Sequence, residues 1–359
     1  YSVNDDGRIR GPFGDPTYKY RKRIDPPSCG LASGKARKRP NGPKVRCNHA
    51  TDLFTRKAVK ELETTRRKPF YVQIDYDAPH GDVRSPVGPQ PATRHIGKAS
   101  RTPLAKDPSF NELDMSDKPE LIQEAAPALL TGDVNRKMKT AYRSQLASLL
   151  TVDEGVGAII KALRRSGELE NTYIFFVSDH GFFFGEHRFS LAKFLPYEST
   201  SSVSMAVRGP DVPRRSSSGE VVGNIDIPAT VAELAGVEPE YELDGRSLSR
   251  FWDDPFRRSR RPVGISLSRP TEVPQLSARA PALRYSGYRV GPYKLIRYLL
   301  GGSELYDLRS DPYELENRYD DPSYAEVRQY LDLHYDDAVD CVGDGCRQSL
   351  PEWPQPSLP

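Results

Sequence analysis

The stretch Tyr173–Tyr197, YIFFVSDHGFFFGEHRFSLAKFLPY, decides how we interpret the fold of this chain. The apolar run Tyr173–Val177 predicts a fully buried strand of a parallel sheet. Asp179 and His180 follow directly, and Gly181 permits the chain to bend after them. Because ligands of parallel α/β sheets bind beyond the carboxyl ends of the strands, we expect Asp179 and His180 to face a ligand site.

The residue types around this stretch suit the binding of a divalent cation and an anion. Asp and His are ligands for Ca²⁺, Mg²⁺, Mn²⁺ or Zn²⁺. Lys193 adds a flexible cation of the kind that neutralises a tetrahedral oxyanion. His80 is a second candidate, because it follows an expected strand at 69–76. Each residue alone is commonly a turn or surface residue, but their joint order and placement favour a site.

The pattern of the rest of the chain predicts an α/β protein. We expect a mostly parallel sheet sandwiched by helices, followed by a small C-terminal antiparallel α+β subdomain. The expected helices cover 52–66, 136–166 and 225–235, and further strands cover 203–207, 283–288, 293–298 and 304–308. The expected divisions are an irregular basic segment at 1–50, the core at 51–250, the antiparallel subdomain at 251–335 and a tail at 336–359.

Composition limits the class of protein. The 359 residues hold ample material for a core, and no apolar run approaches the roughly 18 residues of a membrane span. A net charge of +3 argues against a dedicated nucleic-acid binder. Segment 19–46 is locally basic, with ten Lys or Arg against one acid. It is either a patch for a polyanion or a solvated loop, and oligomeric state cannot be deduced from the sequence.

The four cysteines form two local pairs in polar sequence, without zinc spacing. Disulfides Cys29–Cys47 and Cys341–Cys346 are the natural expectation, with free surface thiols as the alternative. Such disulfides fit an extracytoplasmic location, whether secreted, periplasmic or lysosomal. The chain begins at Tyr1 without the pattern of a signal peptide.

Several collinear stretches resemble the type I sulfatases of the alkaline-phosphatase superfamily. They are YVQIDYDAPH at 71–80, PSFNELDMSDKP at 108–119, NTYIFFVSDHGFFFGEHRFSLAKFLPYE at 171–198, DGRSL at 244–248 and ELYDLRSDPYELEN at 304–317. Within this family, these stretches most resemble N-acetylglucosamine-6-sulfatases and arylsulfatase-like members. The resemblance implies an alkaline-phosphatase-like fold whose N-terminal part is missing here. It also implies hydrolysis of a sulfate ester, on a sugar or glycosaminoglycan.

The resemblance further implies a role for each candidate residue. Asp179 and His180 match the second half of a divalent metal site, which usually holds calcium. Lys193 matches the lysine that binds a sulfate oxygen, and His80 matches a histidine that contacts the sulfate and helps to protonate the leaving alcohol. His187 is expected on the substrate side, near the mouth of the site. Glu198, which follows the same loop, is expected to be structural.

Two family elements do not occur in this sequence. The family's nucleophile is a formylglycine made within C/S-x-P-x-R, and no Cys or Ser of the chain has that context. Asp5-Asp6 is the only early Asp pair, and it reads as a polar turn rather than the first half of a metal site. We therefore expect the C-terminal portion of a sulfatase, with the nucleophile before Tyr1, and no catalysis by the chain alone.

Two other functions are compatible with the sequence. One is a phosphodiesterase or phosphonate hydrolase of the same superfamily, which shares the Asp-His after the strand. The other is a non-catalytic binder of anionic glycans that uses segment 19–46 and Lys193. In all three cases the partner is a sulfated or otherwise anionic small molecule or glycan.

Overall fold

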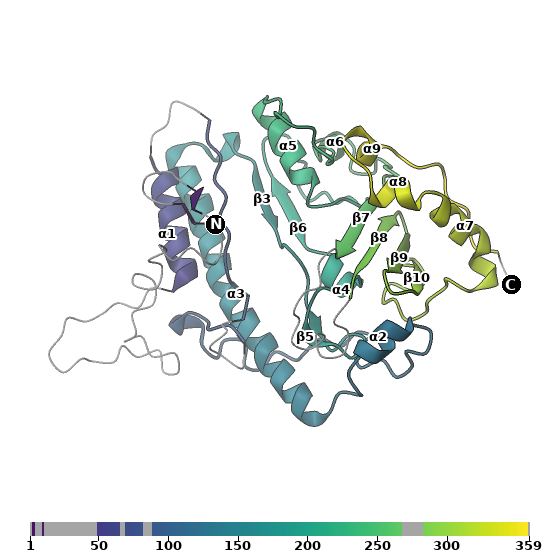
Figure 1. Ribbon diagram of the computed structural model, residues 1–359. Helices are drawn as coiled ribbons and strands as arrows, with labels where there is room; N and C mark the ends of the chain where they lie inside the picture. Colours follow the sequence, from purple (N-terminus) through teal and green to yellow (C-terminus); the bar gives the residue numbers. More distant parts are fainter. Residues whose placement is uncertain are drawn as a thin grey trace. The chain divides into compact units, whose positions relative to one another are not determined.

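The structure is a computed structural model that describes residues 2–3, 9–10, 49–64, 69–81, 88–267 and 283–357. The chain divides into two compact units (Figure 1). The first contains residues 1–104 and 136–172, and the second contains 105–135 and 173–359. The expected domain divisions near 50, 250 and 335 stay a prediction.

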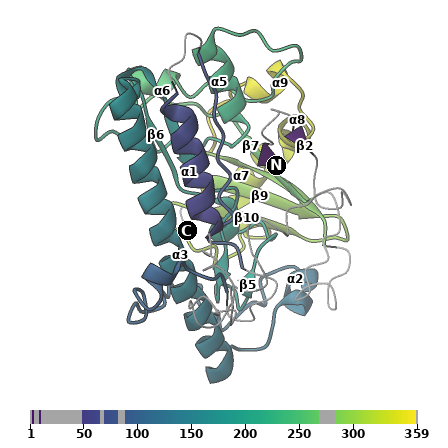
Figure 2. The ribbon, with the colours of Figure 1, turned by 90° about the vertical axis from the view of Figure 1, so that its left-hand side faces the viewer.

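Two helices form the centre of the first unit. Helix α1 (Ala50–Leu62) lies alongside the 35-residue helix α3 (Gly132–Ser166), as Figure 2 shows. Both helices occupy the ranges that the apolar spacing predicts, within a few residues. Gly155 of α3 is required for the close approach, because a Cβ atom there would lie 2.6 Å from Thr55 Oγ1 and 2.8 Å from the Tyr76 hydroxyl.

The remainder of the first unit is short and irregular. Its other elements are β1 (Ser2–Val3), β2 (Ile9–Arg10), η2 (Thr93–His95) and η3 (Leu169–Asn171). Arg94 fastens η2 by hydrogen bonds to Asp52, at 2.7 and 2.9 Å, and to Glu154 at 2.7 Å. The strand expected at 69–76 is not formed. That segment pairs with no strand among the described residues, and an unpaired segment has no hydrogen-bonded ladder to define it.

The second unit contains a two-stranded ribbon that consists of β3 (Ile174–Val177) and β6 (Met205–Arg208). Both strands were expected, but they pair antiparallel, as do the other paired strands of the described residues. The expectation of full burial is also wrong, because Phe176 is 47% and Val177 37% exposed. One physical reason is that, among the described residues, this sheet consists of β3 and β6 alone, so β3 has no second neighbouring strand.

The expected C-terminal antiparallel sheet is confirmed. Its strands are β7 (Val263–Leu267), β8 (Tyr285–Val290), β9 (Tyr293–Tyr298) and β10 (Ser303–Asp307), in the order β10-β9-β8-β7. Gly287 of β8 has no room for a side chain, because a Cβ atom would collide with the carbonyl oxygen of Leu295 on β9.

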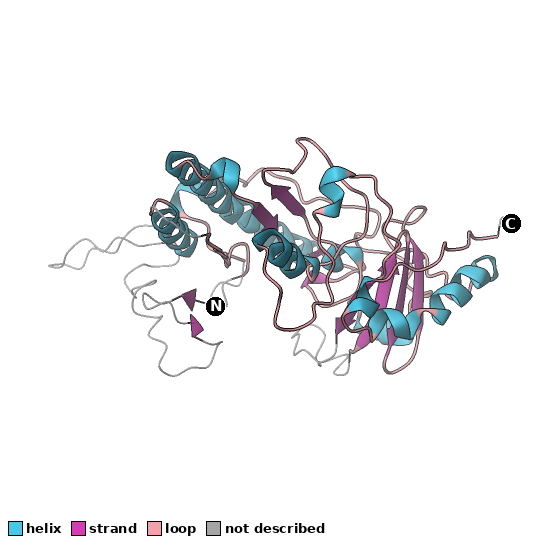
Figure 3. Cartoon of the chain, turned by 90° about the horizontal axis from the view of Figure 1, so that it is seen from above, coloured by secondary structure: helices cyan, strands magenta, loops and turns pink. Residues whose placement is uncertain are grey.

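Both faces of this sheet are covered. One core consists of sheet residues such as Tyr288 and Leu295 packed against α7 (Ala325–Leu333) and α8 (Tyr335–Val339), which lie beside the strands in Figure 3. The other core joins Ile296 and Tyr298 to the loop around Phe189. The loop that carries Lys193 is therefore built onto the sheet.

The remaining elements of the second unit are short. They are α2 (Glu120–Ala125), β4 (Phe183–Phe184), β5 (Ser190–Ala192), α4 (Glu198–Ser201), α5 (Asp226–Ala235), α6 (Arg250–Asp253), η4 (Pro322–Tyr324) and α9 (Asp344–Arg347). Helix α5 ends at Ala235, where the expected range 225–235 also ends, and Gly236 caps it in the left-handed conformation.

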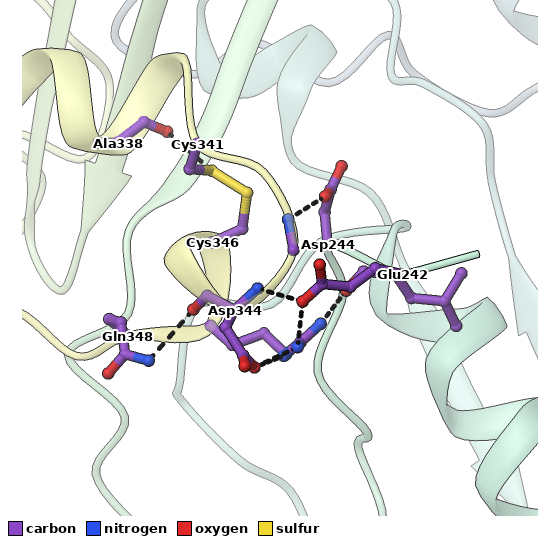
Figure 4. The surroundings of a disulfide bond; sticks show 10 residues. Glu242, Asp244, Ala338, Cys341, Asp344, Cys346 and Gln348 are labelled. Atoms are coloured by element: carbon purple, nitrogen blue, oxygen red, sulfur yellow. Dashed lines mark hydrogen bonds and ion pairs between the residues drawn. A yellow bond between two sulfur atoms is a disulfide. The ribbon is translucent and has the colours of Figure 1, made fainter. Parts of the chain in front are cut away.

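A disulfide joins Cys341 to Cys346, as expected. Figure 4 shows that the loop it closes lies against Glu242 and Asp244. Gly343 N donates to Asp244 Oδ1 at 2.7 Å, and Asp344 N donates to Glu242 Oε1 at 2.8 Å. The bridge thus holds α9 against the segment that follows α5.

Other expectations lie outside the described residues or concern membranes. Cys29, Cys47, Asp5-Asp6 and the basic segment 19–46 all fall outside the described ranges. Within those ranges, none of the helices combines the length and the apolar character that crossing a membrane requires.

Candidate active site

The loop after β3 is clamped onto the segment that leads into α4. Gly181 N donates to Thr200 O at 2.8 Å, and Phe182 N donates to Ser199 O at 2.9 Å. A Cβ atom at Gly181 would collide with the carbonyl oxygen of Ser199, so only glycine permits this approach. The clamp fixes the backbone immediately after Asp179 and His180.

The structure brings His180 and Lys193 into direct contact. The Nδ1 atom of His180 lies 2.7 Å from the carbonyl oxygen of Gly181. Because a carbonyl only accepts hydrogen bonds, Nδ1 carries the proton and Nε2 presents a lone pair. Lys193 Nζ donates to that lone pair at 2.9 Å, and Asp179 Oδ2 lies 3.5 Å from the same Nε2. Three of the expected site residues therefore converge.

This group faces outward. The side chain of Asp179 is 85% exposed and that of His180 is 33% exposed. Lys193 is half-buried, with Nζ 5.1 Å from the centre of the Phe194 ring. An anion approaching this surface would meet the ammonium of Lys193, whose hydrogen bond to the imidazole of His180 uses one of its three N–H donors. Lys193 thus retains donors for an oxyanion.

The hairpin that carries Lys193 holds an unusual number of left-handed residues. His187, Arg188, Leu191 and Phe194 have φ values of 49°, 66°, 53° and 77°. Such conformations cost about 1 kcal/mol or more each and persist where surrounding contacts over-determine them. Strain of this kind gathers at functional sites, which supports the choice of this hairpin as part of one.

Contacts with the segment around Glu112 hold the hairpin in place. His187 Nδ1 lies 2.6 Å from Glu112 Oε2, and the imidazole stacks on the Tyr197 ring at 4.1 Å. Arg188 donates to the carbonyl oxygens of Glu112 and Leu113, both at 2.6 Å. His187 is 1% exposed. This position differs from the expected one at the mouth of a site. Its contact with substrate stays a prediction that the burial does not favour.

A buried ionic network supports the end of the same loop, and sequence reasoning missed most of it. Lys294 Nζ lies 3.0 Å from Glu198 Oε1 and 2.8 Å from Glu314 Oε1, and Arg289 lies 2.6 Å from Glu198 Oε2. Burial alone would raise the pKa of Glu198, but Lys294 and Arg289 outweigh it and lower that pKa. These ion pairs fit the structural role that was expected of Glu198. The only sequence signal for Lys294 was a charged residue within an apolar strand.

His80 belongs to the first unit. It is exposed and follows the cis peptide bond Ala78–Pro79. Its Nδ1 atom lies 2.9 Å from the carbonyl oxygen of Gly81. By the same reasoning as for His180, its Nε2 atom carries the lone pair. His80 is thus an accessible imidazole, and its catalytic role stays a prediction.

The metal expectation fits the described residues only in part. They contain no group of three or more His, Cys, Asp or Glu side chains arranged to hold a metal. Asp179 and His180 would supply two donors, the second only if Nε2 of His180 exchanged Lys193 for the metal, whereas calcium takes six to eight oxygen ligands. A metal held here would need ligands beyond those of the described residues, so we assign no chemical step to one.

Comparison with known families identifies the class of protein. The sulfatase family model matches residues 18–237, which is more than half of the chain, so the chain belongs to the sulfatase family. A second family model, "N-sulphoglucosamine sulphohydrolase, C-terminal", matches residues 185–338. The second match contains the whole antiparallel sheet, which the sequence had predicted as a separate subdomain.

Curated relatives refine the comparison. An arylsulfatase of Volvox carteri is 31% identical over 342 residues, which cover 83% of this chain and 52% of the relative. An N-acetylglucosamine-6-O-sulfatase of Bacteroides thetaiotaomicron is 25% identical over 342 residues, which cover 80% of this chain and 61% of the relative. The chain thus spans little more than half the length of these two relatives.

Solved structures agree on the fold. One is a protein in complex with its substrate, D-glucosamine-2-N,6-O-disulfate, with a TM-score of 0.67 and 25% identity over 80% of this chain and 69% of that one. A phosphonate monoester hydrolase from Silicibacter pomeroyi has a TM-score of 0.63 at 19% identity, over 80% of this chain and 59% of that one. At that identity the second likeness shows the fold alone.

Proposed function

We propose that this chain forms the anion-binding side of a sulfatase active site, in a protein that hydrolyses a sulfate ester. The observation that carries the proposal is the contact between Lys193 Nζ and His180 Nε2 at 2.9 Å, beside Asp179. It places an ammonium with unused donors next to two potential metal ligands. The family match supports reading this group as part of a sulfate site.

Each residue then has a chemical task. Lys193 donates to a sulfate oxygen and stabilises the negative charge that gathers there during transfer. His180 accepts a hydrogen bond from Lys193 and so fixes the direction of its ammonium. In its doubly protonated form, His80 would donate the proton on its accessible Nε2 to the alcohol that leaves. In sulfatases a formylglycine supplies the nucleophile; its motif does not occur in the 359 residues, and no step is assigned to it.

The substrate class that we propose is a sulfated amino sugar. The Bacteroides thetaiotaomicron relative is named an N-acetylglucosamine-6-O-sulfatase. A relative from Homo sapiens is named an N-acetylglucosamine-6-sulfatase and is 31% identical over 219 residues, which cover 60% of this chain and 38% of the relative. The solved neighbour holds a sulfated glucosamine. The sulfatase family match at 18–237 includes the loop from Asp179 to Lys193.

We also propose an extracytoplasmic location. The Cys341–Cys346 disulfide supports it, because such bonds persist in oxidising compartments. A relative from Drosophila melanogaster, 28% identical over 201 residues, 55% of this chain and 17% of the relative, is named an extracellular sulfatase.

Binding of D-glucosamine-6-sulfate to the full chain, measured by calorimetry, tests the proposal. We expect saturable binding that Lys193→Ala weakens by about tenfold or more, since a charge-assisted hydrogen bond is lost. Lys161→Ala, in an exposed position on α3, is the matched control and should leave the affinity unchanged. Equal loss in both variants, or no binding by the unaltered chain, would exclude Lys193 as the sulfate ligand.

A second measurement addresses turnover and substrate type. Sulfate release from the same sugar, and hydrolysis of a phosphonate monoester, are compared for the full chain. We expect neither reaction, because covalent catalysis without its nucleophile loses most of its rate. Sulfate release at the rate of a competent sulfatase would refute the expected inactivity. Turnover of the phosphonate alone would instead favour the phosphonate hydrolase alternative.

A further inference from the structure

A cluster of arginines encloses a small cavity beside α5 and α6. The cavity has a volume of about 10 Å³ and is lined by Arg246, Arg250 and Arg261, together with the hydroxyl-bearing residues Ser247 and Ser259. The residues come from the DGRSL segment, from α6 and from the stretch before β7. The proposed function assigns no task to any of them.

The walls of this cavity are held in place by Asp226, which is fully buried at the start of α5. Asp226 Oδ1 accepts from Arg246 N at 2.8 Å, and Oδ2 accepts from Gly223 N at 2.9 Å. Oδ2 also pairs with the guanidinium of buried Arg261. Both oxygens of the carboxylate are therefore engaged, and its charge is matched by Arg261.

Positive charge remains in excess around the cavity. Arg246, Arg250 and Arg257 stand near Arg261. A second nearby carboxylate, Glu220, accepts from Ser259 N at 2.8 Å and pairs with exposed Arg258. Burial, and then repulsion by the neighbouring guanidiniums, lower the pKa of Arg246 and of Arg250. A folded protein tolerates such repulsion poorly unless an anion relieves it.

Arg250 shows the same excess at the level of single atoms. Its Nε and Nη1 atoms are buried and have no hydrogen-bond partner among the described residues. Buried polar groups are nearly always paired, and an unpaired charged group is especially costly. Because Arg250 lines the cavity, a ligand seated there is a candidate partner for these donors.

The size of the cavity decides which ligand fits. A volume of about 10 Å³ gives room for one water-sized particle. A tetrahedral sulfate or phosphate is much larger than that, whereas a monatomic chloride ion exceeds a water molecule only slightly, and the surrounding guanidiniums repel cations. A water molecule would supply an acceptor but would leave the charge uncompensated. We propose that the cavity binds a single chloride ion, held by Arg246, Arg250 and Arg261.

This site is separate from the candidate active site. Tyr173, directly before β3, stacks on Trp252 of α6 with ring centres 5.1 Å apart. Asp179 follows the other end of β3. Figures 1 and 2 both show α5 and α6 toward one end of the ribbon and β5 toward the other. The chloride would stabilise the packing of the DGRSL segment on α5 and would not touch the substrate.

Bromide, which replaces chloride and scatters X-rays anomalously, gives the direct test. Crystals of the full chain soaked in sodium bromide should show one anomalous peak among the three guanidiniums. Arg250→Met should abolish it. Arg258→Met, which alters an 85% exposed side chain nearby, should preserve it. Absence of the peak in the unaltered protein, or a sulfate or phosphate in its place, would overturn the proposal.

Unfolding in solution provides the second test, and it does not require crystals of the variants. Sodium chloride is compared with sodium gluconate at 200 mM, since gluconate is too large to enter. For a dissociation constant of about 20 mM, chloride should lower the unfolding equilibrium constant about tenfold. Arg246→Gln serves if Arg250→Met fails to fold, and either variant should lose the dependence. Equal stability of the unaltered protein in both salts would refute chloride binding.

Discussion

Two sheets of the second unit, the four-stranded sheet and the β3-β6 ribbon, contain similar residues but differ greatly in burial. Strands β8, β9 and β10 bury almost every side chain between two cores, and α7 and α8 pack on one face. Strands β3 and β6 are also apolar, yet Phe176 and Val177 remain more than a third exposed. An apolar strand sequence therefore does not specify burial, which depends on whether another layer is present to cover it.

The difference also separates stability from chemistry. The covered sheet holds the large buried tyrosines and the Lys294 network, and it supplies the surface on which the Lys193 loop is built. The open ribbon delivers Asp179 and His180 to an exposed position. Functional residues of proteins often lie in regions of lower local stability. The exposed positions of Asp179 and His180 agree with that tendency.

Two lysines on either side of this division provide the largest expected contrast. Lys294→Ala leaves Glu198 and Glu314 without their buried cation and should lower the free energy of unfolding by about 3–5 kcal/mol. Lys193→Ala removes only a half-exposed contact with His180 and should cost less than about 1 kcal/mol. Urea denaturation measures both. Similar losses would mean that the Lys193 loop is as integral to stability as the sheet.

Apolar truncations sharpen the comparison. Leu295→Ala empties a fully buried position on β9 and should cost about 2–5 kcal/mol. Phe176→Ala removes a larger side chain, but one that is 47% exposed, and should cost about 1 kcal/mol or less. The free energies of unfolding of the two variants are compared by urea denaturation. If Phe176→Ala were the more damaging change, the ribbon would have to be covered in solution.

The disulfide provides a third, smaller effect. Replacing Cys341 and Cys346 by serine removes the constraint on a short loop and should lower the free energy of unfolding by about 2 kcal/mol. It should also loosen the contacts of Gly343 and Asp344 with the segment after α5. Hydrogen exchange at those two amides reports the loosening. Unchanged protection would show that the contacts do not depend on the bridge.

The smallest expected effect concerns acid. The pKa of Glu198 is lowered, so its pairing stabilises the fold fully above the ordinary value of 4.5 and is lost as pH falls below it. Glu198→Gln removes this group. The variant should be less stable at neutral pH, yet should lose less stability than the unaltered protein between neutral pH and pH 3. Parallel pH profiles of the unfolding free energy would contradict the lowered pKa.

Much of the fold could be predicted because its signals are local. The spacing of apolar residues identified α1, α3 and α5, and alternating apolar strands with glycine turns identified β8, β9 and β10. The strand before Asp179 was also identified, but its pairing direction was not. The direction in which two strands pair depends on which distant segment supplies the hydrogen bonds. The same holds for whether segment 69–76 forms a strand at all. The spacing of apolar residues carries no information about either.

The sequence by itself determined the family, the order of the elements and the convergence of Asp179, His180 and Lys193, because these depend on residue types at short spacing. Only the tertiary structure decided that His187 is buried against Glu112, that Lys294 supports the loop from a strand about a hundred residues away, and that arginines enclose a cavity. The physical reason is that charges and imidazoles acquire their roles from partners distant in sequence, and burial is a property of the layers around a residue rather than of the residue itself.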